Sequence, residues 1–303
     1  MAAILITGFA GGLAQRTARL LLEKGREVVG VDYRPAPPLP GVTLYRASYN
    51  KTAIEDVFRR HSVESVLHLG RVGNLSEAME KRFELNVVGT QKIMNLCLAH
   101  GVKSLVVLST FHIYGAHPKN HTHISEEDPL RAGTGFPEIA DAIQLDNMAT
   151  TWVYRHPEVS VAVLRPVNVV GPTIRNTMST FLRLPRVPYL AGYNPMTQFI
   201  HEDDLARAIA AAMEGSLKGV FNVAGGDAVP WRTALDILGA KTLPIPSSLV
   251  KLYLRSFSEF PEYLVNFFKY PCVLTDRAFR EACGWRAEVD VRRTLVSTVP
   301  AKR

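Results

Sequence analysis

Short apolar segments alternate with amphipathic helical segments throughout the first half of the chain. The apolar segments, each short enough for a buried strand, are Ile4–Thr7, Glu27–Val31, Thr43–Tyr45, Ser65–Leu69, Ser104–Ser109 and Val159–Leu164. The helical segments between them are Thr17–Lys24, Lys51–His61, Leu75–His100 and Pro137–His156. Because neighbouring parallel strands need a long crossover, usually a helix, this alternation predicts an α/β fold with a doubly wound parallel sheet.

The pattern changes after Pro166, where prolines interrupt the chain repeatedly. A predicted helix at Asp203–Met213 and a predicted strand at Val220–Ala224 follow this proline-rich stretch. We therefore expect two domains. The first is a sheet domain over residues 1–168, to which residues 197–225 return, and the second is a smaller, partly interleaved domain over residues 169–303.

The composition excludes several classes of protein. The 303 residues are 47% apolar and 21% charged, which excludes a disordered or collagen-like chain. The net charge of +7 comes from scattered Lys and Arg, so we expect a solvated basic surface and no nucleic-acid partner. Three cysteines without C-x-x-C spacing support neither a disulfide framework nor a metal site. Together with the lack of a basic leader or a long apolar run, they predict a cytoplasmic protein.

Three glycines, Gly8, Gly11 and Gly12, lie between the first predicted strand and the following helix. Asp32 closes the second predicted strand, 24 residues after Gly8. In such a turn, backbone N–H groups approach a pyrophosphate at the helix N-terminus, and the later carboxylate binds ribose hydroxyls. This arrangement predicts a Rossmann-like dinucleotide-binding domain. We expect NAD rather than NADP because Asp32 would repel a 2′-phosphate, although Arg34 keeps NADP open.

Further motifs follow the glycine turn in a fixed order. They are Leu67–Gly70, Asn86–Thr90, Ser109–Gly115, Leu164–Val169 and Phe199–Ala206. With the glycine turn and Asp32, they make the chain resemble the extended short-chain dehydrogenase/reductase family over residues 1–225. That family contains NAD-dependent nucleotide-sugar epimerases and dehydratases, and the resemblance implies the same Rossmann-like fold with a C-terminal substrate-binding domain.

The resemblance also implies a set of cofactor contacts. The residues placed at the pyrophosphate are Gly8, Gly11, Gly12 and Leu13. Those placed at the adenosine half are Asp32, Tyr33, Ser48 and Tyr49. Those placed at the nicotinamide half are Leu69, Gly70, Arg71, Pro166, Asn168 and Val169, and the set is completed by Asn86 and Leu108.

The catalytic residues of the resembled family are only partly matched. There, a Tyr and a Lys four residues later exchange the proton, and a Ser or Thr, here Thr110, holds the substrate oxygen. The aligned helix carries Glu138 and Ala142 instead, and no Lys of the chain has a Tyr four residues before it. We therefore expect a replaced or lost proton relay. The candidates are His112, which otherwise fills the pocket wall, and Glu138 or Asp141, which are otherwise solvated helix residues.

Three functions follow from these observations. The first is an NAD-dependent oxidoreductase or epimerase-like enzyme with a replaced relay. The second is a catalytically silent dinucleotide-binding sensor, scaffold or regulator, which the loss of the Tyr–Lys pair favours. The third is a nucleotide-sugar epimerase or dehydratase.

The tail between Pro244 and Tyr270 bears on the ligand. It holds seven aromatic residues and only three cations, Lys251, Arg255 and Lys269. This predicts a ligand more apolar than a nucleotide-sugar, although the rings could equally form the domain's own core or contact a membrane surface. Arg175 and Arg183 are candidate substrate contacts that keep the nucleotide-sugar open.

The two longest predicted helices also predict a homodimer, since the resembled family packs them between subunits. Their apolar residues outnumber what one sheet face needs, namely Met79, Phe83, Leu85, Met94, Ile143, Met148 and Trp152.

Overall fold

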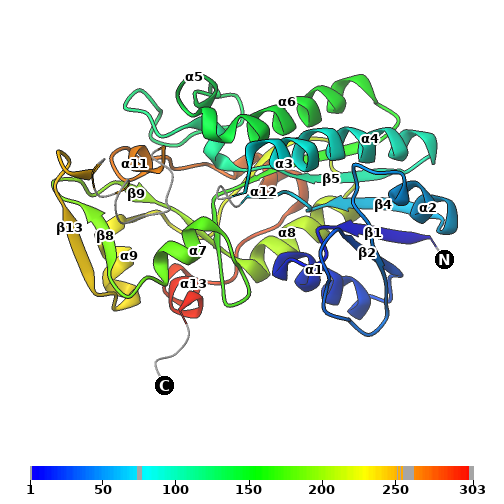
Figure 1. Ribbon diagram of the computed structural model, residues 1–303, viewed down its shortest axis with the longest axis horizontal. Coiled ribbons are helices and arrows are strands. Elements are labelled where there is room, and N and C mark those ends of the chain that lie inside the picture. Colours follow the sequence, from blue (N-terminus) through cyan, green and yellow to red (C-terminus); the bar gives the residue numbers. More distant parts are fainter. Residues whose placement is uncertain (1, 74–76, 251, 253, 255–262, 300–303) are drawn as a thin grey trace.

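A computed structural model describes residues 2–73, 77–250, 252, 254 and 263–299. The start of the predicted helix at residues 75–100 lies outside the described residues, as do five members of the predicted apolar tail, namely Lys251, Tyr253, Arg255, Phe257 and Phe260. The predicted α/β class is confirmed (Figure 1).

Seven parallel strands form the central sheet, in the order β11-β6-β5-β4-β1-β2-β3. They are β1 (Ala3–Thr7), β2 (Val28–Asp32), β3 (Val42–Arg46), β4 (Val63–His68), β5 (Ser104–Leu108), β6 (Ser160–Pro166) and β11 (Gly219–Val223). The strand order runs outward in opposite directions from β1 and β4. Because the loops after these two strands diverge, a crevice forms at the carboxyl ends of the strands, where such sheets bind ligands.

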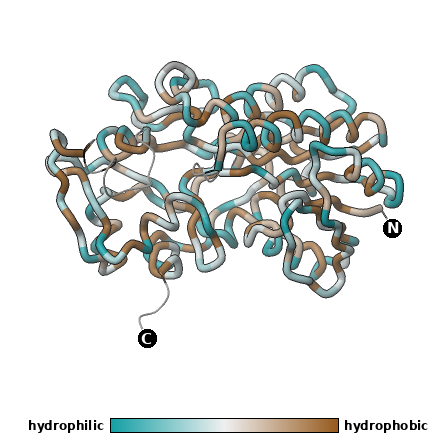
Figure 2. The backbone as a smooth tube through the Cα atoms, viewed as in Figure 1, coloured by the Kyte–Doolittle hydropathy of each residue, from teal (hydrophilic) through white to brown (hydrophobic). Residues whose placement is uncertain are grey.

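Helices cover both faces of this sheet, as a doubly wound fold requires (Figure 1). One face carries α1 (Gly12–Glu23) and α8 (Glu202–Glu214), and the other carries α2 (Ala53–Arg60), α4 (Gly89–Ala99) and α6 (Ala140–Arg155). Successive residues of β1 serve the two faces in turn, since Ile4 and Ile6 pack with α1 and Leu5 packs with α4. Figure 2 shows hydrophobic segments along these central strands.

The predicted helix at residues 75–100 contains an irregular turn. Regular helix α3 (Met79–Phe83) passes through a π-helical turn, η1 (Glu84–Val88), before α4 begins. Within that turn, the Asn86 side chain bonds both backbone groups of Val72, at 2.7 and 2.9 Å. The π turn therefore fixes Asn86 against the loop after β4, as such turns often do beside functional sites.

The second half of the chain builds a smaller layer beside the carboxyl ends of the sheet. Three strand pairs lie there, namely β7 (Asn168–Val170) with β10 (Phe199–His201), β8 (Val187–Leu190) with β13 (Thr242–Ile245), and β9 (Met196–Thr197) with β12 (Val229–Pro230). Helices α7 (Thr177–Leu182), α9 (Trp231–Leu238) and α13 (Val291–Thr298) pack around Trp231 as a separate apolar cluster. Within the described part of the chain, no helix has the length and apolarity to cross a bilayer.

Candidate active site

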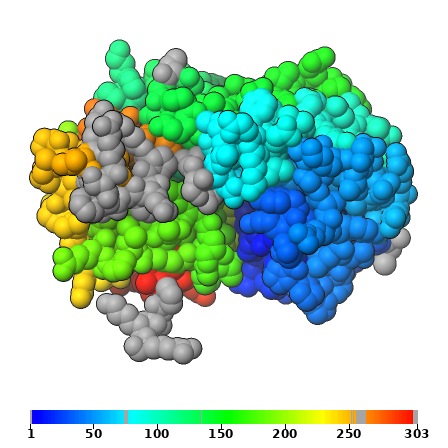
Figure 3. All heavy atoms as spheres, in the orientation of Figure 1, coloured from blue at the N-terminus to red at the C-terminus, as the bar shows by residue number. Residues whose placement is uncertain are grey.

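A cavity of about 400 Å³ opens at the carboxyl ends of the central strands. Its walls come from the glycine turn after β1, the loops after β2, β4 and β5, helix α6, and the segment from Pro166 to Met178. Figure 3 shows the N-terminal part of the chain, in blue and cyan, meeting the green middle segment on one face of the molecule. The cavity thus draws its lining from both halves of the chain.

The backbone of the glycine turn lies very close to the backbone of the loop after β4. Gly8 has φ +72°, and a side-chain carbon there would lie 2.6 Å from Gly70 Cα. Only glycine satisfies both conditions. Helix α1 begins at Gly12, so its unpaired N–H groups and its positive dipole end face the cavity that Gly11 and Leu13 line.

Asp32 occupies the far end of the cavity with a fixed orientation. Its carboxylate is buried and accepts backbone hydrogen bonds from Ala10 and Arg34, both at 2.9 Å. The Arg34 guanidinium adds contacts at 3.3 Å while remaining half exposed. Tyr33 and Tyr49 line the cavity beside this carboxylate. The residues at this end therefore fit an adenosine ribose with an aromatic surface next to it.

Thr110 and His112 also line the cavity and follow β5, which β4 and β1 separate from the Asp32 strand, β2, so the pair lies toward the opposite end. Thr110 Oγ1 lies 3.1 Å from His112 Nδ1, so the two side chains are hydrogen-bonded. The His112 ring packs against Phe111, Phe267 and Tyr263, with ring centroids 4.3, 4.9 and 5.9 Å away. Burial, and secondarily the positive charge of Arg71, lower the pKa of His112 to about 3. The imidazole is therefore neutral at physiological pH.

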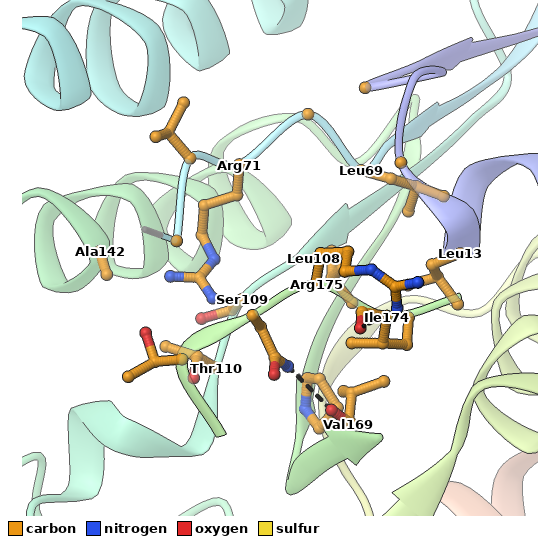
Figure 4. A pocket seen from close by; sticks show the side chains of 18 of the residues that line it. Leu13, Leu69, Arg71, Leu108, Ser109, Thr110, Ala142, Val169, Ile174 and Arg175 are labelled. Atoms are coloured by element: carbon orange, nitrogen blue, oxygen red, sulfur yellow. Dashed lines mark hydrogen bonds between the residues drawn. The ribbon is translucent and has the colours of Figure 1, made fainter. Parts of the chain in front are cut away.

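Four arginines line the cavity, namely Arg34, Arg71, Arg82 and Arg175. Arg82 is neutralised by Asp141, 3.0 Å away, and donates to the Glu138 carbonyl oxygen at 2.8 Å. The Asp141 carboxylate also accepts a hydrogen bond from Asn86 at 2.5 Å. Figure 4 shows Arg71 reaching toward Thr110 and the helix of Ala142, while Arg175 lies near Leu13 at the other side.

The cavity gathers most of the residues that the sequence predicts for the site. These are Gly8, Gly11, Gly12, Leu13, Asp32, Tyr33, Tyr49, Leu69, Gly70, Arg71, Leu108, Thr110, His112, Asp141, Pro166, Asn168, Val169 and Arg175. Asp141 is buried and is therefore not a solvated helix residue. Of the two positions aligned with the family's Tyr and Lys, Ala142 lines the cavity and Glu138 does not.

Four predicted residues do not line the cavity. They are Ser48, Asn86, Glu138 and Arg183. Ser48 donates to Asn50, and Asn86 holds the loop behind the cavity wall. The Arg183 guanidinium donates to the carbonyl oxygens of Gly171, Ile174 and Thr298, at 2.7–2.9 Å. Arg183 therefore ties together backbone segments around α7.

Sequence reasoning missed Arg82, Thr173 and Met178 as cavity residues, and it offered Tyr263 only as one of the tail aromatics that could line a pocket or form a core. Tyr263 lies far from every motif along the chain and reaches the cavity only through α11 (Leu264–Phe267), which follows it. No pattern in the sequence predicts that Tyr263 lines this particular cavity. Arg34, which the sequence offered as a cofactor discriminator, does lie beside Asp32.

A second, smaller cavity adjoins the Thr110–His112 end. It holds about 20 Å³ and shares Phe111, His112, Asn168 and Met178 with the larger cavity. Its other walls are largely apolar, namely Met196, Thr197, Trp231, Leu264, Phe267, Phe268 and Cys272. The Trp231 indole N–H is buried with no hydrogen-bond partner among the described residues. This aromatic recess adjoins the main cavity at His112 and has room for about one water molecule.

The chain belongs to the NAD dependent epimerase/dehydratase family, whose model matches residues 4–224. An uncharacterized protein of Mycobacterium tuberculosis is 28% identical over 206 residues, covering 66% of this chain and 54% of that protein. The chain thus spans about half the length of that relative. A UDP-glucuronate 4-epimerase of Thermodesulfobacterium geofontis is 25% identical over 248 residues, covering 73% of this chain and 75% of that enzyme.

Solved structures agree with this assignment at the level of the fold. The UDP-glucose 4-epimerase of Thermus thermophilus, in complex with NAD, aligns with a TM-score of 0.78 at 22% identity. The alignment covers 98% of this chain and 97% of that one. The predicted family and the predicted Rossmann-like fold are therefore confirmed, and NAD is the cofactor after which the family is named.

Proposed function

We propose that this protein is an NAD-binding oxidoreductase of the epimerase/dehydratase type, with a proton relay of its own. The observation that carries the proposal is a single cavity with the glycine turn and Asp32 at one end and the hydrogen-bonded pair Thr110–His112 at the other. The close approach at Gly8 and the fixed Asp32 carboxylate support the proposal that the first two features bind the pyrophosphate and ribose of NAD.

When bound, NAD supplies a carbon that accepts or returns hydride. The chain's own residues would hold the substrate and move the proton. Thr110 Oγ1 would hold the substrate oxygen, and the proton of the substrate hydroxyl would pass through Thr110 Oγ1 to His112 Nδ1 across their 3.1 Å contact. The neutral imidazole has the free electron pair that this step needs. In the reverse direction the same nitrogen returns the proton.

Two alternatives remain as competing proposals. Arg175 lines the cavity and has a guanidinium suited to a diphosphate, which favours a nucleotide-sugar substrate like those named for the two epimerases above. A catalytically silent dinucleotide-binding sensor, scaffold or regulator would keep the glycine turn and Asp32 but would transfer no hydride.

We also propose that the ligand has an apolar part, since the aromatic recess beside His112 offers rings and methionine side chains for contact. The division into an NAD-binding part (1–168, with 197–225) and a substrate-binding part (169–303) stays a proposal too. The three cysteines are unpaired, which supports our proposal of a reducing, cytoplasmic compartment.

We propose a homodimer, on narrower grounds than the sequence suggested. Leu85, Met94 and Trp152 are buried in the protein's own core, so they are not spare apolar surface. Met79 and Phe83 remain exposed, and an apolar groove between α4 and α6 is lined by Val88, Leu96 and Met148, among others. Light scattering at micromolar concentration should give twice the chain mass of 33.5 kDa, and the monomer mass would contradict the proposal.

Replacing Asp32 by alanine should weaken NADH binding by about 10- to 100-fold, because hydrogen bonds to a charged group contribute about 1.5–3 kcal/mol. NADPH should lose less affinity, since the variant removes the repelling carboxylate and frees Arg34 for a 2′-phosphate. Calorimetric titration with both nucleotides measures the two effects. Asp56→Ala, at an exposed carboxylate paired with Arg59, is the matched control. Tighter binding of NADPH than of NADH by the unmodified protein would contradict the assignment of NAD.

A further inference from the structure

Among the described residues, two of the four arginines that line the main cavity are paired with a carboxylate, and the other two, Arg71 and Arg175, are not. Arg34 is paired with Asp32, and Arg82 is paired with Asp141. Arg175, at the glycine-turn side, donates to the carbonyl oxygens of Pro172 and Ile174, at 2.8 and 3.0 Å.

Arg71 differs from the other three arginines of the cavity. Across the described residues, its guanidinium makes no hydrogen bond and no ion pair. Asp141 acts on it only electrostatically and not as an ion-pair partner. The Asp141 carboxylate already accepts hydrogen bonds from Arg82 and Asn86. Arg71 is half-buried, and burial lowers its pKa.

The position of this guanidinium is specific. Figure 4 shows it extending from the loop after β4 toward Thr110, on the side of the cavity away from Arg175. It also acts electrostatically on His112 and on the phenol of Tyr263, which line the same end. Arg71 therefore stands beside the pair that would handle the substrate oxygen.

A guanidinium offers five N–H donors in a planar fork that matches the two oxygens of a carboxylate. Burying an unpaired cation costs folding free energy. Proteins retain such a cost at sites where a bound ligand supplies the opposite charge. The aromatic recess adjoins the same end of the cavity through His112 and Phe111. A ligand that satisfies both features carries an anionic group and an apolar body.

We propose that Arg71 binds a carboxylate of the substrate, so that the protein acts on an apolar hydroxy or keto acid. This inference rests on the proposed function and names its substrate class. It gives Arg71 to the substrate in place of the nicotinamide half of the cofactor, where the family resemblance puts it. The carboxylate would sit against Arg71 and the reacting oxygen against Thr110. The apolar body would contact Phe111, Met178 and Tyr263, which line the main cavity. The anion would also offset the positive charge of Arg71, which contributes, after burial, to the lowered pKa of His112. Acid binding and proton transfer would then be coupled.

The test uses the full chain saturated with NADH, followed by the fluorescence of the bound nucleotide. The probes are 3-phenyllactate and its neutral primary amide, which differ only in the charged group and undergo no hydride transfer with NADH. The acid should bind at least about tenfold more tightly than the amide, which corresponds to about 1.4 kcal/mol. This preference should disappear in Arg71→Met, survive in part in Arg71→Lys, and stay intact in Arg60→Met, an exposed arginine outside the cavity.

Two further readouts separate the possible roles of Arg71. A structural arginine would lower the melting temperature when replaced, whereas Arg71→Met should leave it unchanged or raise it. An arginine that serves the cofactor would make Arg71→Met lose NADH affinity more than tenfold, and that result would overturn the proposal. Phenyl phosphate and inorganic phosphate test for a phosphate ligand, and tighter binding of either than of the acid would overturn it as well.

Equal affinity for acid and amide in the unmodified protein, or no acid binding at about 10 mM, would also overturn the proposal. Failure of the proposed function has a different signature, because NADH itself would then not bind. In that case the acid and the amide are compared by thermal shift without nucleotide. A preference for the acid that is lost in Arg71→Met would then support Arg71 as the residue that binds the carboxylate.

Discussion

Replacing Asp146 by alanine should lower the free energy of unfolding by about 3–5 kcal/mol, because it leaves a buried arginine without its counter-ion. Asp146 and Arg165 are both buried, and two contacts join them, at 3.0 and 2.6 Å. Arg165 also donates to the Tyr114 hydroxyl at 2.9 Å, and Ser109 donates to Asp146. These hydrogen bonds and this ion pair connect α6 to the ends of β5 and β6, next to Thr110 in the chain.

Urea unfolding measures the effect. Asp146→Asn keeps the shape and part of the hydrogen bonding, so we expect it to lose less stability than alanine. Asp56→Ala, which removes the exposed partner of Arg59, should cost no more than about 1 kcal/mol. Equal losses in Asp146→Ala and Asp56→Ala would show that the buried pair does not support the site.

Replacing His112 by glutamine should slow turnover by about 10²- to 10⁴-fold, which is the usual contribution of a positioned proton acceptor. Glutamine can still bond Thr110 but cannot accept the proton. NADH affinity should stay within about threefold, since Gly8 and Asp32 lie at the other end of the cavity. Thr110→Val should produce a similar loss, and His123→Gln, an exposed histidine outside the cavity, should produce none.

Unchanged turnover in His112→Gln would mean that another group moves the proton. Glu138, which the sequence also offers, does not line the cavity, and Asp141 is held by Arg82 and Asn86. A loss of NADH affinity equal to the loss of rate would instead assign His112 to cofactor binding.

The fold was predictable because buried parallel strands leave short apolar runs and their crossovers leave helical patterns. The cofactor end of the site was predictable for a related reason: the glycine turn and Asp32 adjoin consecutive strands, so local sequence places them together. No sequence pattern predicted the π turn at residues 84–88, because Asn86 within it contacts Val72 and Asp141, which lie elsewhere in the chain.

The substrate end was less predictable because its residues come from distant parts of the chain. Arg82 meets Asp141 across 59 positions, and Tyr263 joins the same wall from the C-terminal part. Arg183 illustrates the opposite error: its charge suggested a ligand, but the side chain ties together three backbone carbonyl groups. Only tertiary contacts distinguish an arginine that binds backbone from one, like Arg71, that has no such partner among the residues that the structure describes.

The central claim is that this chain transfers hydride to and from NAD by means of Thr110 and His112. The most direct measurement loads the unmodified protein with NAD and follows absorbance at about 340 nm in a single turnover, a wavelength at which only the reduced nicotinamide absorbs. The alcohols offered are lactate, 3-phenyllactate, UDP-glucose and UDP-glucuronate. We expect reduction with at least one of them, and an at least 100-fold slower rise in the Thr110→Val/His112→Gln double variant. No reduction with any of the four by a protein that binds NAD, or an unchanged rate in the double variant, would contradict the claim.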